Sequence, residues 1–237
     1  MNIYRIQLWY APAVVAIPLL INGCGNSLLH RKIKEGVIEY ALTFPDYDPN
    51  GLMAGMLPEK TLLYFGDGQQ MADLSAGMGV FHTSMMVNTE DQVMNYHMSV
   101  MSKKLVSELH PRDLVSFNKE SQAFTIVFTN ITDTIAGYPC KKAIAVYANI
   151  DQPEAELWYT DAIEMETPNW YGPYSEIPGV LLRYEMVQYG MRMQLNATSV
   201  TAGPVDPIKF KAKGEYDKVA PEVLHHELEE VLSTFQS

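Results

Sequence analysis

Cysteine is scarce in this chain, which has 237 residues and two cysteines, Cys24 and Cys140. Small exported domains that depend on disulfides carry several paired cysteines, and two cysteines supply at most one bridge. The fold must therefore be stabilised by its hydrophobic core. A composition of 47% hydrophobic and 19% charged residues is that of a globular protein with enough chain for one substantial core.

Basic residues are also few, with 17 Lys and Arg against 28 Asp and Glu, so the net charge is −11. Nucleic-acid binding requires clustered Lys and Arg side chains that neutralise phosphates. The longest basic run in the chain is only His30-Arg31-Lys32. We therefore expect no nucleic-acid partner.

A long hydrophobic run is absent as well. The most apolar stretch, residues 8–21, holds about 14 residues, whereas a helix that spans a membrane needs roughly 20. It follows a single positive charge, Arg5, and is interrupted by Pro12 and Pro18. This length and charge pattern is typical of the core of a signal peptide.

The residues that follow this stretch are Leu-Ile-Asn-Gly-Cys at positions 20–24. They resemble the lipobox of bacterial lipoproteins, in which the cysteine becomes the acylated N-terminus of the mature protein. The resemblance implies a signal peptide at residues 1–23, lipid attachment at Cys24, a tether at residues 24–35 and one domain at residues 36–237. The alternative is an ordinary secretory signal with an incidental cysteine.

An acylated Cys24 would anchor the protein to a membrane of the bacterial cell envelope, because each buried methylene contributes about 0.8 kcal/mol. The next residue is Gly25, not the Asp that retains some lipoproteins at the inner membrane. We therefore expect an outer-membrane protein that faces the periplasm.

Residues 36–44 alternate in character, and their large apolar side chains, Ile38, Tyr40, Leu42 and Phe44, fall on one face. A period of two with one apolar face is typical of a half-buried strand. Similar segments recur at short intervals, with turn-forming residues between several of them. They predict an antiparallel, mainly β fold. The further predicted strands are residues 61–65, 69–74, 80–88, 92–100, 104–107, 123–130, 142–149, 154–160, 180–187 and 191–200.

The C-terminal segment, residues 221–235, has a helical period instead. Pro221 stands where a first helical residue is expected. The apolar residues that recur at helical spacing are Leu224, Leu228, Val231 and Phe235. We expect one amphipathic helix that lies across the sheet.

Three roles are open to Cys140, which is the only cysteine outside the N-terminal segment: nucleophile, metal ligand or packing residue. A catalytic thiol needs a histidine base and a lowered pKa. None of the candidate bases lies in a recognisable local signature; they are His82, His97, His110, His225 and His226. Because free cysteines are among the most buried residues, we interpret Cys140 as a packing residue at the entry to a strand.

Methionine is unusually frequent, with 14 residues. Two neighbouring predicted strands carry histidine and methionine together, and alternation places His82 on one face with Met86, and His97 on one face with Met101. These four residues could form a site for a soft metal such as Cu(I). The alternatives are plain core filling or an adaptable apolar surface for partners of variable shape.

Three later segments read GYPCKKA at residues 137–143, WYT at 158–160 and GPYSEIPGVL at 172–181. They resemble the GLPGLI family of exported Bacteroidetes proteins, which has Gly-Tyr-x-Cys-x-Lys-Ala, Trp-Tyr-Thr and Gly-Pro…Gly-Leu-Pro-Gly-Leu-Ile at these places. In this chain Glu176 replaces the first glycine of the last signature. The family looks in turn like a relative of the LolA/LolB lipoprotein carriers, and the resemblance extends over roughly residues 36–235.

The resemblance implies a mainly β (α+β) fold, a strongly curved antiparallel half-barrel with a C-terminal covering helix. The concave face of such a sheet exposes apolar side chains unless helices plug it. We expect a hydrophobic or lipidated ligand to bind there. The expected contact residues are Trp158, Trp170, Tyr171, Met85 and Met98. An ordinary core with an aromatic edge is the alternative for the aromatic residues.

The resulting hypothesis is a lipid-anchored, non-enzymatic envelope protein that binds and releases a hydrophobic ligand, with the C-terminal helix as a gate. We expect a membrane partner through Cys24, a lipid or lipoprotein as ligand, and no cofactor. The resemblance supplies no catalytic residues. One alternative is a structural or interaction lipoprotein whose half-barrel is filled by its own side chains, and a cysteine- or metal-dependent enzyme is another.

Overall fold

The computed structural model of the chain describes residues 32–48, 50–51, 54–118, 123–149 and 154–234. The chain divides into two units, residues 1–30 and 31–237, and all described residues belong to the second unit. The predicted signal peptide and Cys24 therefore lie outside the described residues. Within the described ranges, no helix combines the length and the apolar composition that crossing a membrane requires.

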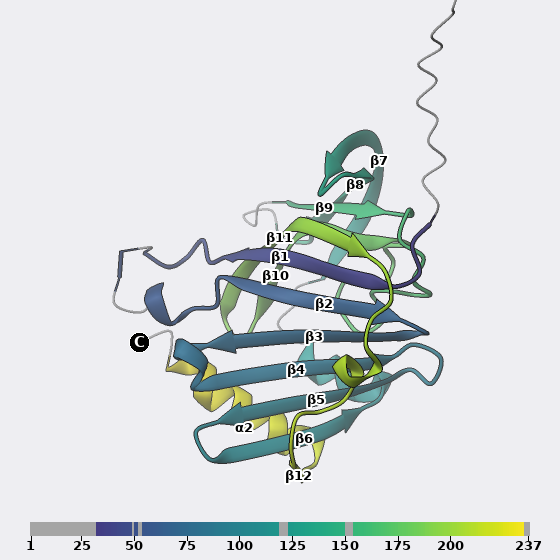
Figure 1. The fold of residues 1–237 in the computed structure, drawn as a ribbon. Coiled ribbons are helices and arrows are strands. Elements are labelled where there is room, and N and C mark those ends of the chain that lie inside the picture. The colour runs from purple at the N-terminus through teal and green to yellow at the C-terminus, as the bar shows by residue number, and fades with distance from the viewer. Residues whose placement is uncertain (1–31, 49, 52–53, 119–122, 150–153, 235–237) are drawn as a thin grey trace, which may run out of the picture. The chain divides into compact units, whose positions relative to one another are not determined.

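One β-sheet of twelve strands forms the second unit (Figure 1). The strand order is β12-β6-β5-β4-β3-β2-β1-β11-β10-β9-β8-β7, so β12 and β7 are free edges and the sheet is not closed. Neighbours are antiparallel except β12 and β6, which are parallel. The strands are β1 (Gly36–Thr43), β2 (Lys60–Gly66), β3 (Gln69–Ala76), β4 (Phe81–Asn88), β5 (Val93–Val100), β6 (Lys103–Leu109), β7 (Phe124–Ile135), β8 (Tyr138–Tyr147), β9 (Ala155–Thr160), β10 (Val180–Gln188), β11 (Met191–Ala202) and β12 (Asp217–Lys218).

Helices are few in the described part of the chain. They are α1 (Pro111–Phe117), α2 (Pro221–Ser233) and the short 3-10 helices η1 (Ala54–Met56), η2 (Gly77–Gly79) and η3 (Pro207–Phe210). The mainly β class predicted from the sequence is therefore confirmed.

The alternating pattern of residues 36–44 forms β1, as predicted. Ile38, Tyr40 and Leu42 are buried, while the residues between them are only half-buried. β1 pairs with β2 on one side and with β11 on the other, so the first strand of the chain lies in the middle of the sheet. Burial of one face only is what the period of two requires.

Each predicted strand segment overlaps one of the strands β1–β11, and the largest difference concerns the hairpin of β7 and β8. The prediction ended one strand at residue 130 and began the next at residue 142, whereas the strands run to Ile135 and from Tyr138. Ala136 and Gly137 join them with φ angles of 50° and 84°. A two-residue turn with positive φ matches the twist of the strands, so both continue to the turn.

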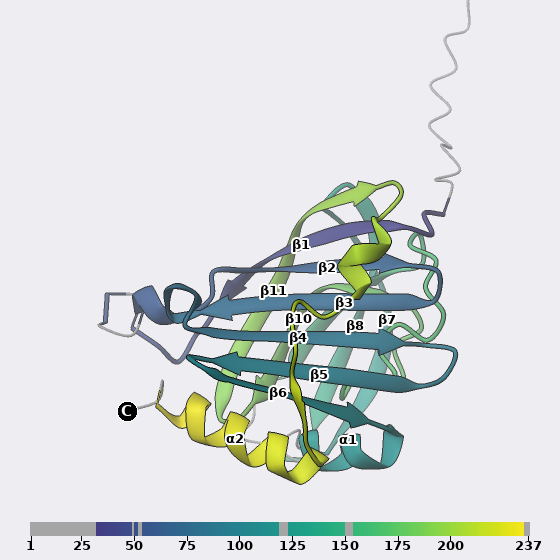
Figure 2. The ribbon, with the colours of Figure 1, turned by 60° about the horizontal axis from the view of Figure 1, so that its bottom comes forward.

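The sheet is strongly curved. β5 and β10 are six positions apart in the strand order, and a flat sheet would separate them by roughly 29 Å. Yet Tyr96 of β5 and Met186 of β10 line the same cavity. Figure 2 shows the bend of the sheet, with β8, β10 and β11 running behind β2–β5. We call the face that carries Tyr40, Met85 and Tyr96 the inner face, and the opposite face the outer face.

The C-terminal segment passes from the outer face to the inner face. Residues 203–219, which we call the strap, cross the outer face of β2–β6 before α2 begins (Figure 2). On this face Lys209 Nζ lies 5.1 Å from the ring centre of Tyr64. α2 then packs against the inner face, where Leu224 and Leu228 are fully buried in one cluster with Met98.

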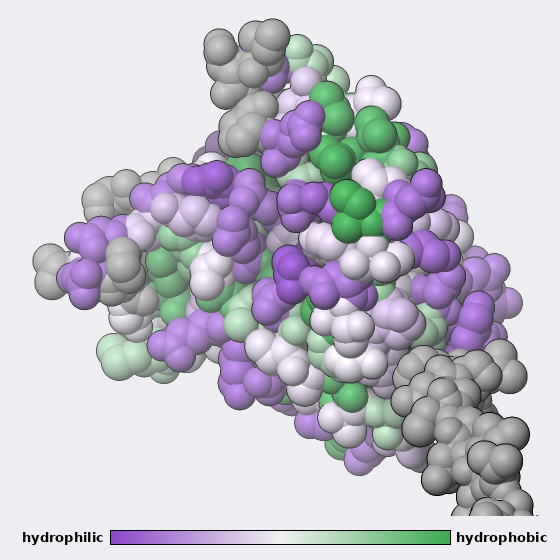
Figure 3. All heavy atoms as spheres, turned by 90° about the horizontal axis from the view of Figure 1, so that it is seen from above, coloured by the Kyte–Doolittle hydropathy of each residue, from purple (hydrophilic) through white to green (hydrophobic). Residues whose placement is uncertain are grey.

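The β7 edge carries exposed apolar side chains, Val127, Phe128 and Ile131. Figure 3, which views the molecule from the side of β7 and β8, shows a group of hydrophobic residues in a mostly hydrophilic surface. The register of β7 against β8 shifts between Phe128 and Thr132. Such a bulge limits the pairing of an edge strand with other chains.

Candidate ligand-binding cavity

A cavity of about 170 Å³ lies against the inner face of the sheet. Because one water takes roughly 10–15 Å³ on the same scale, the cavity has room for on the order of ten waters. Its walls come from β1–β5, β10 and β11, from Leu114 and Phe117 of α1, and from residues 169–174 between β9 and β10. At this place the inner face is not filled by side chains of the described residues.

The strand period explains which residues form the walls. Alternate residues of a strand point to the same face, so Thr83 and Met85 of β4 face the cavity while His82 and Ser84 face outward. The same rule selects the cavity residues of the neighbouring strands.

Apolar and aromatic side chains dominate the lining, and none of the described residues that line the cavity carries a charge. An unpaired charge costs several kcal/mol when it is buried in such surroundings. The cavity therefore suits uncharged, largely apolar guests. The apolar lining residues are Leu42, Leu63, Ala72, Leu74, Met85, Met94, Leu114, Phe117, Pro173, Leu181, Met186, Met193 and Leu195.

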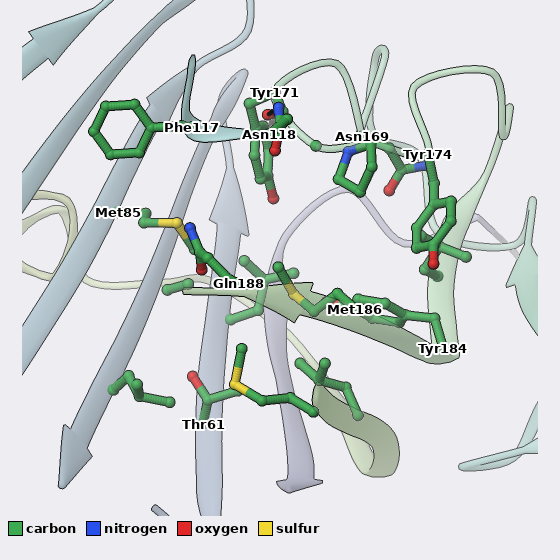
Figure 4. Close-up of a pocket in the computed structure, with 18 of the residues that line it drawn as sticks. Thr61, Met85, Phe117, Asn118, Asn169, Tyr171, Tyr174, Tyr184, Met186 and Gln188 are labelled. Atoms are coloured by element: carbon green, nitrogen blue, oxygen red, sulfur yellow. Dashed lines mark hydrogen bonds between the residues drawn. The ribbon is translucent and has the colours of Figure 1, made fainter. Parts of the chain in front are cut away.

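The cavity has two ends that differ in chemistry (Figure 4). Tyr174 and Tyr184 lie on one side of the view, and Met85 and Phe117 lie on the opposite side, with Met186 between them. We call these the tyrosine end and the methionine end. Flexible methionine side chains adapt to apolar guests of different shape.

The tyrosine end is built by aromatic contacts. The rings of Tyr40 and Tyr184 meet edge to face with centroids 6.2 Å apart, and those of Tyr174 and Tyr184 do so at 6.5 Å. Most hydroxyl groups here are used within the protein. The Tyr40 hydroxyl donates to the Leu181 carbonyl at 2.7 Å, and the Tyr174 hydroxyl donates to the Glu185 carbonyl at 2.6 Å. The Tyr171 hydroxyl donates to Gln70 Oε1 at 3.2 Å.

Burial keeps the tyrosines of the cavity neutral. It raises the pKa of Tyr96 and of Tyr171 to about 12. It also raises the pKa of Tyr40, Tyr174 and Tyr184 above the ordinary value. All five hydroxyl groups are thus protonated at physiological pH, and the cavity presents dipoles without charges.

The structure brings two of the five predicted contact residues, Met85 and Tyr171, to the cavity wall. Met98 also belongs to the inner face, but it is fully buried in the cluster that contains the leucines of α2. Met98 is not among the residues that line the cavity. Sequence reasoning had no means to place α2 over this part of the strand.

The two predicted tryptophans do not line the cavity. Trp158 points away from it, where its ring centre is 5.7 Å from both Lys142 Nζ and Arg183 Cζ. Trp170 packs edge to face on Tyr171, with ring centroids 5.9 Å apart. It supports a wall residue without forming the wall itself.

Several wall residues were not singled out from the sequence, among them Tyr40, Tyr184, Met186 and Met193. The alternation of residues on the predicted strands does indicate some of them. Tyr40 lies on the apolar face predicted for residues 36–44, and Tyr184 and Met186 alternate on one predicted strand. What was missing was the curvature, which brings these distant strands together around one space.

The four residues considered for a soft metal, His82, Met86, His97 and Met101, do not meet. Met101 lies opposite Val80, whose carbonyl accepts from the Met101 N–H at 3.2 Å. About six residues of extended chain separate Val80 from Met86, so the two methionines lie on the order of 20 Å apart. In the described part of the chain, no group of three or more His, Cys, Asp or Glu residues is arranged to hold a metal ion.

The strap covers this outer surface with polar contacts. His82 Nε2 and Asp73 Oδ1 share a hydrogen bond of 2.8 Å, and Lys213 Nζ of the strap lies 3.7 Å from Asp73. The ring of Tyr216 meets His97 edge to face, with centroids 4.9 Å apart. Burial lowers the pKa of His97. His82 is thus hydrogen-bonded within the sheet, and His97 is covered by the ring of Tyr216, with its buried Nδ1 left without a hydrogen-bond partner among the described residues.

The packing role predicted for Cys140 is confirmed, since its side chain is only 1% exposed. Burial raises the pKa of the thiol to about 11. Its Sγ donates weakly to the Tyr138 carbonyl at 3.4 Å. A thiol that stays protonated at neutral pH is a poor nucleophile.

A scan of protein-family models finds no match for the chain, and neither does a search of curated proteins. Among solved structures, the chain is similar to PNGF-II in its P21 and C2 space groups, with a TM-score of 0.51 in both. The identity is 14% and 15%, and the similarity covers 82% and 83% of this chain. The chain spans about a third of the length of PNGF-II, since 33% of that chain is covered. At this identity the similarity concerns the fold alone.

A second solved structure is the β-barrel-like protein of the DUF1849 domain of unknown function from Brucella abortus. It is 9% identical, and the similarity covers 73% of this chain and 99% of that one. The TM-score of 0.26 is too low to support an argument about fold or function.

Proposed function

We propose that this chain is a lipid-anchored protein of the bacterial cell envelope that binds a hydrophobic or lipidated ligand in the cavity and releases it without covalent chemistry. In this proposal the curved open sheet is a half-barrel similar to the LolA/LolB carriers, within the exported GLPGLI-type proteins of Bacteroidetes. The anchor at Cys24 and the outer-membrane location facing the periplasm rest on the sequence around residues 20–25.

The unfilled cavity is the observation that carries the proposal. An acyl chain that enters it exchanges water for leucine, methionine and aromatic side chains. Each buried methylene contributes about 0.8 kcal/mol, so eight of them contribute roughly 6 kcal/mol before the cost of immobilising the ligand. Binding of this strength needs no charged group and permits release.

In our proposal, movement of the segments that border the cavity widens it for a ligand. Leu114 and Phe117 of α1 line the cavity directly, whereas α2 packs beside it. The two helices touch through the rings of Phe117 and His225, with centroids 5.2 Å apart. In our proposal α2 acts as a gate through this contact, by holding or releasing α1.

The test is to express residues 25–237 without the anchor, purify the protein under native conditions and identify bound lipids by mass spectrometry of an organic extract. A variant with Ala72→Phe, which fills the cavity from β3, is the control and is expected to yield no lipid. A folded protein that carries no lipid and binds no hydrophobic dye would favour the alternative, a structural or interaction lipoprotein without a small-molecule ligand.

A further inference from the structure

Tyr184 differs from the other tyrosines of the cavity in the state of its hydroxyl group. Tyr40, Tyr171 and Tyr174 each donate to a protein acceptor, and the Tyr96 hydroxyl lies near the side chain of Thr83. Among the described residues, the Tyr184 hydroxyl has no hydrogen-bond partner. Nor is its oxygen one of the unpartnered polar atoms that protein atoms seal off. It therefore remains accessible from the cavity whose wall it forms.

Because no described residue accepts its proton, the Tyr184 hydroxyl is satisfied only by cavity water or by a guest. The ring of Tyr184 is held on two sides by Tyr40 and Tyr174. Its position is thus set by packing, and its proton is available to a guest.

Positive charge is absent from this end. The nearest basic residues along β10 and β11 are Arg183 and Arg192, and both face outward. Arg183 Nε donates to Asn196 Oδ1 at 3.0 Å, and Arg192 Nη2 donates to Asp46 at 2.6 Å. A carboxylate or phosphate buried beside Tyr184 would have no cation to pair with, at a cost of several kcal/mol.

The lining of the methionine end is apolar and favours a hydrocarbon chain. Met186 lies between the two ends in Figure 4, and Met85 and Phe117 close the far side. A guest that satisfies the whole cavity therefore has an apolar chain at the methionine end. At the tyrosine end it has one uncharged hydrogen-bond acceptor.

The geometry points to a ligand class: neutral acyl esters or amides, whose carbonyl accepts from the Tyr184 hydroxyl while the acyl chain occupies the methionine end. Ionised fatty acids and other lipids with a charge at the buried carbonyl are disfavoured. This inference rests on the proposed function, because it concerns the same cavity and names the ligand that it takes.

The test compares two probes with the same 12-carbon chain, 1-monolauroylglycerol and laurate, in their ability to displace the neutral dye N-phenyl-1-naphthylamine from the purified protein. At pH 8 we expect the glycerol ester to bind at least ten times more tightly than laurate. The ratio of ester affinity to laurate affinity should decrease at pH 5. This pH is close to the ordinary carboxyl pKa of about 4–5, so part of the laurate is then protonated and neutral.

Substitution of Tyr184 provides the second part of the test. Tyr184→Phe should weaken binding of the glycerol ester about three- to tenfold, the effect of one net hydrogen bond, and should lower the ratio of ester affinity to laurate affinity. Tyr64→Phe, on the outer face, removes a tyrosine hydroxyl elsewhere in the sheet and should leave the ratio of ester to laurate unchanged.

The outcomes separate this inference from the proposed function. Equal binding of laurate and its glycerol ester at pH 8, or an unchanged ester affinity in Tyr184→Phe, would overturn the inference while the carrier proposal stands. Failure of a folded protein to bind the dye and both probes would overturn the proposed function itself.

Discussion

The two faces of β3–β5 are built from alternating residues of the same strands, yet they are completed in opposite ways. On the outer face, Asp73 and His82 share a hydrogen bond, and the strap contributes an ion pair to Asp73 and a ring contact to His97. On the inner face, Ala72 and Met85 border a cavity that the described residues leave unfilled. The chain covers one face, and on the other face it leaves a cavity.

The two faces differ because buried polar groups and buried apolar groups have different requirements. Buried polar groups need partners in fixed positions, so the outer face requires a specific covering segment. An apolar wall makes no such demand, and its unfilled space costs only the lost packing.

Filling the inner face should have the largest effect. Ala72→Phe places a ring in the cavity, so we expect the affinity for N-phenyl-1-naphthylamine to fall at least tenfold in a fluorescence titration. The free energy of unfolding should stay the same or rise by up to about 1 kcal/mol. Ser75→Phe, on the outer side of the same strand, is the control. A folded Ala72→Phe protein with unchanged dye affinity would contradict the assignment of the cavity.

The second prediction separates two tyrosines of the inner face. Tyr174→Phe leaves the Glu185 carbonyl without its donor, so the free energy of unfolding should fall by about 1–3 kcal/mol. Tyr184→Phe removes a hydroxyl that has no partner among the described residues, so the change should stay within about 0.5 kcal/mol. Urea unfolding measures both. Equal losses would show that the Tyr184 hydroxyl is bonded within the protein.

The third prediction concerns pH and the closed outer face. Burial lowers the pKa of His97, while the unfolded chain has the ordinary value of about 6.5. Below that value the unfolded state binds a proton that the folded state excludes, so the free energy of unfolding falls as pH drops from 7.5 to 5.5. The neighbouring Asp73 and His82 act on His97 in opposite directions.

His97→Gln should make this pH dependence shallower in urea unfolding at the two pH values. Tyr184→Phe, on the inner face, should keep the slope of the unmodified protein and is the control. An unchanged slope in His97→Gln would mean that another group causes the loss of stability.

The smallest effect is expected for the ion pair between the strap and the sheet. Lys213 Nζ lies 3.7 Å from Asp73, and the lysine side chain is 70% exposed. Because solvent screens such pairs, Lys213→Ala should lower the free energy of unfolding by at most about 0.5 kcal/mol. Dye affinity should be unaffected. A loss of several kcal/mol in urea unfolding would show that the strap depends on this single contact.

Local patterns in the sequence located most of the fold. Alternation in residues 36–44 predicted β1 and its buried face, and the apolar stripe of residues 221–235 predicted α2, which extends to Ser233 in the described chain. β12 was not predicted, because a two-residue strand exists only through its pairing with β6. The ends of β7 and β8 were misplaced because their turn is shorter than the sequence suggested.

The site was harder to predict than the fold. Of the predicted contact residues, Met85 and Tyr171 lie at the cavity wall, Met85 on a predicted strand and Tyr171 between two predicted strands. Met98 and Trp158 also lie on predicted strands, but Met98 packs in the cluster of α2 and Trp158 points to the other side of the sheet. The hydrogen-bonding state of the cavity hydroxyl groups has no local signature in the sequence.

By itself the sequence determined the class of secondary structure, the face on which each strand is apolar and the buried state of Cys140, since these depend on residues a few positions apart. Only the tertiary structure decided that Tyr40, Tyr96 and Tyr184 surround one space, and that this space stays unfilled. The reason is physical: curvature and the fit of covering segments depend on side chains that are distant along the chain. No short pattern encodes the volume that remains between them.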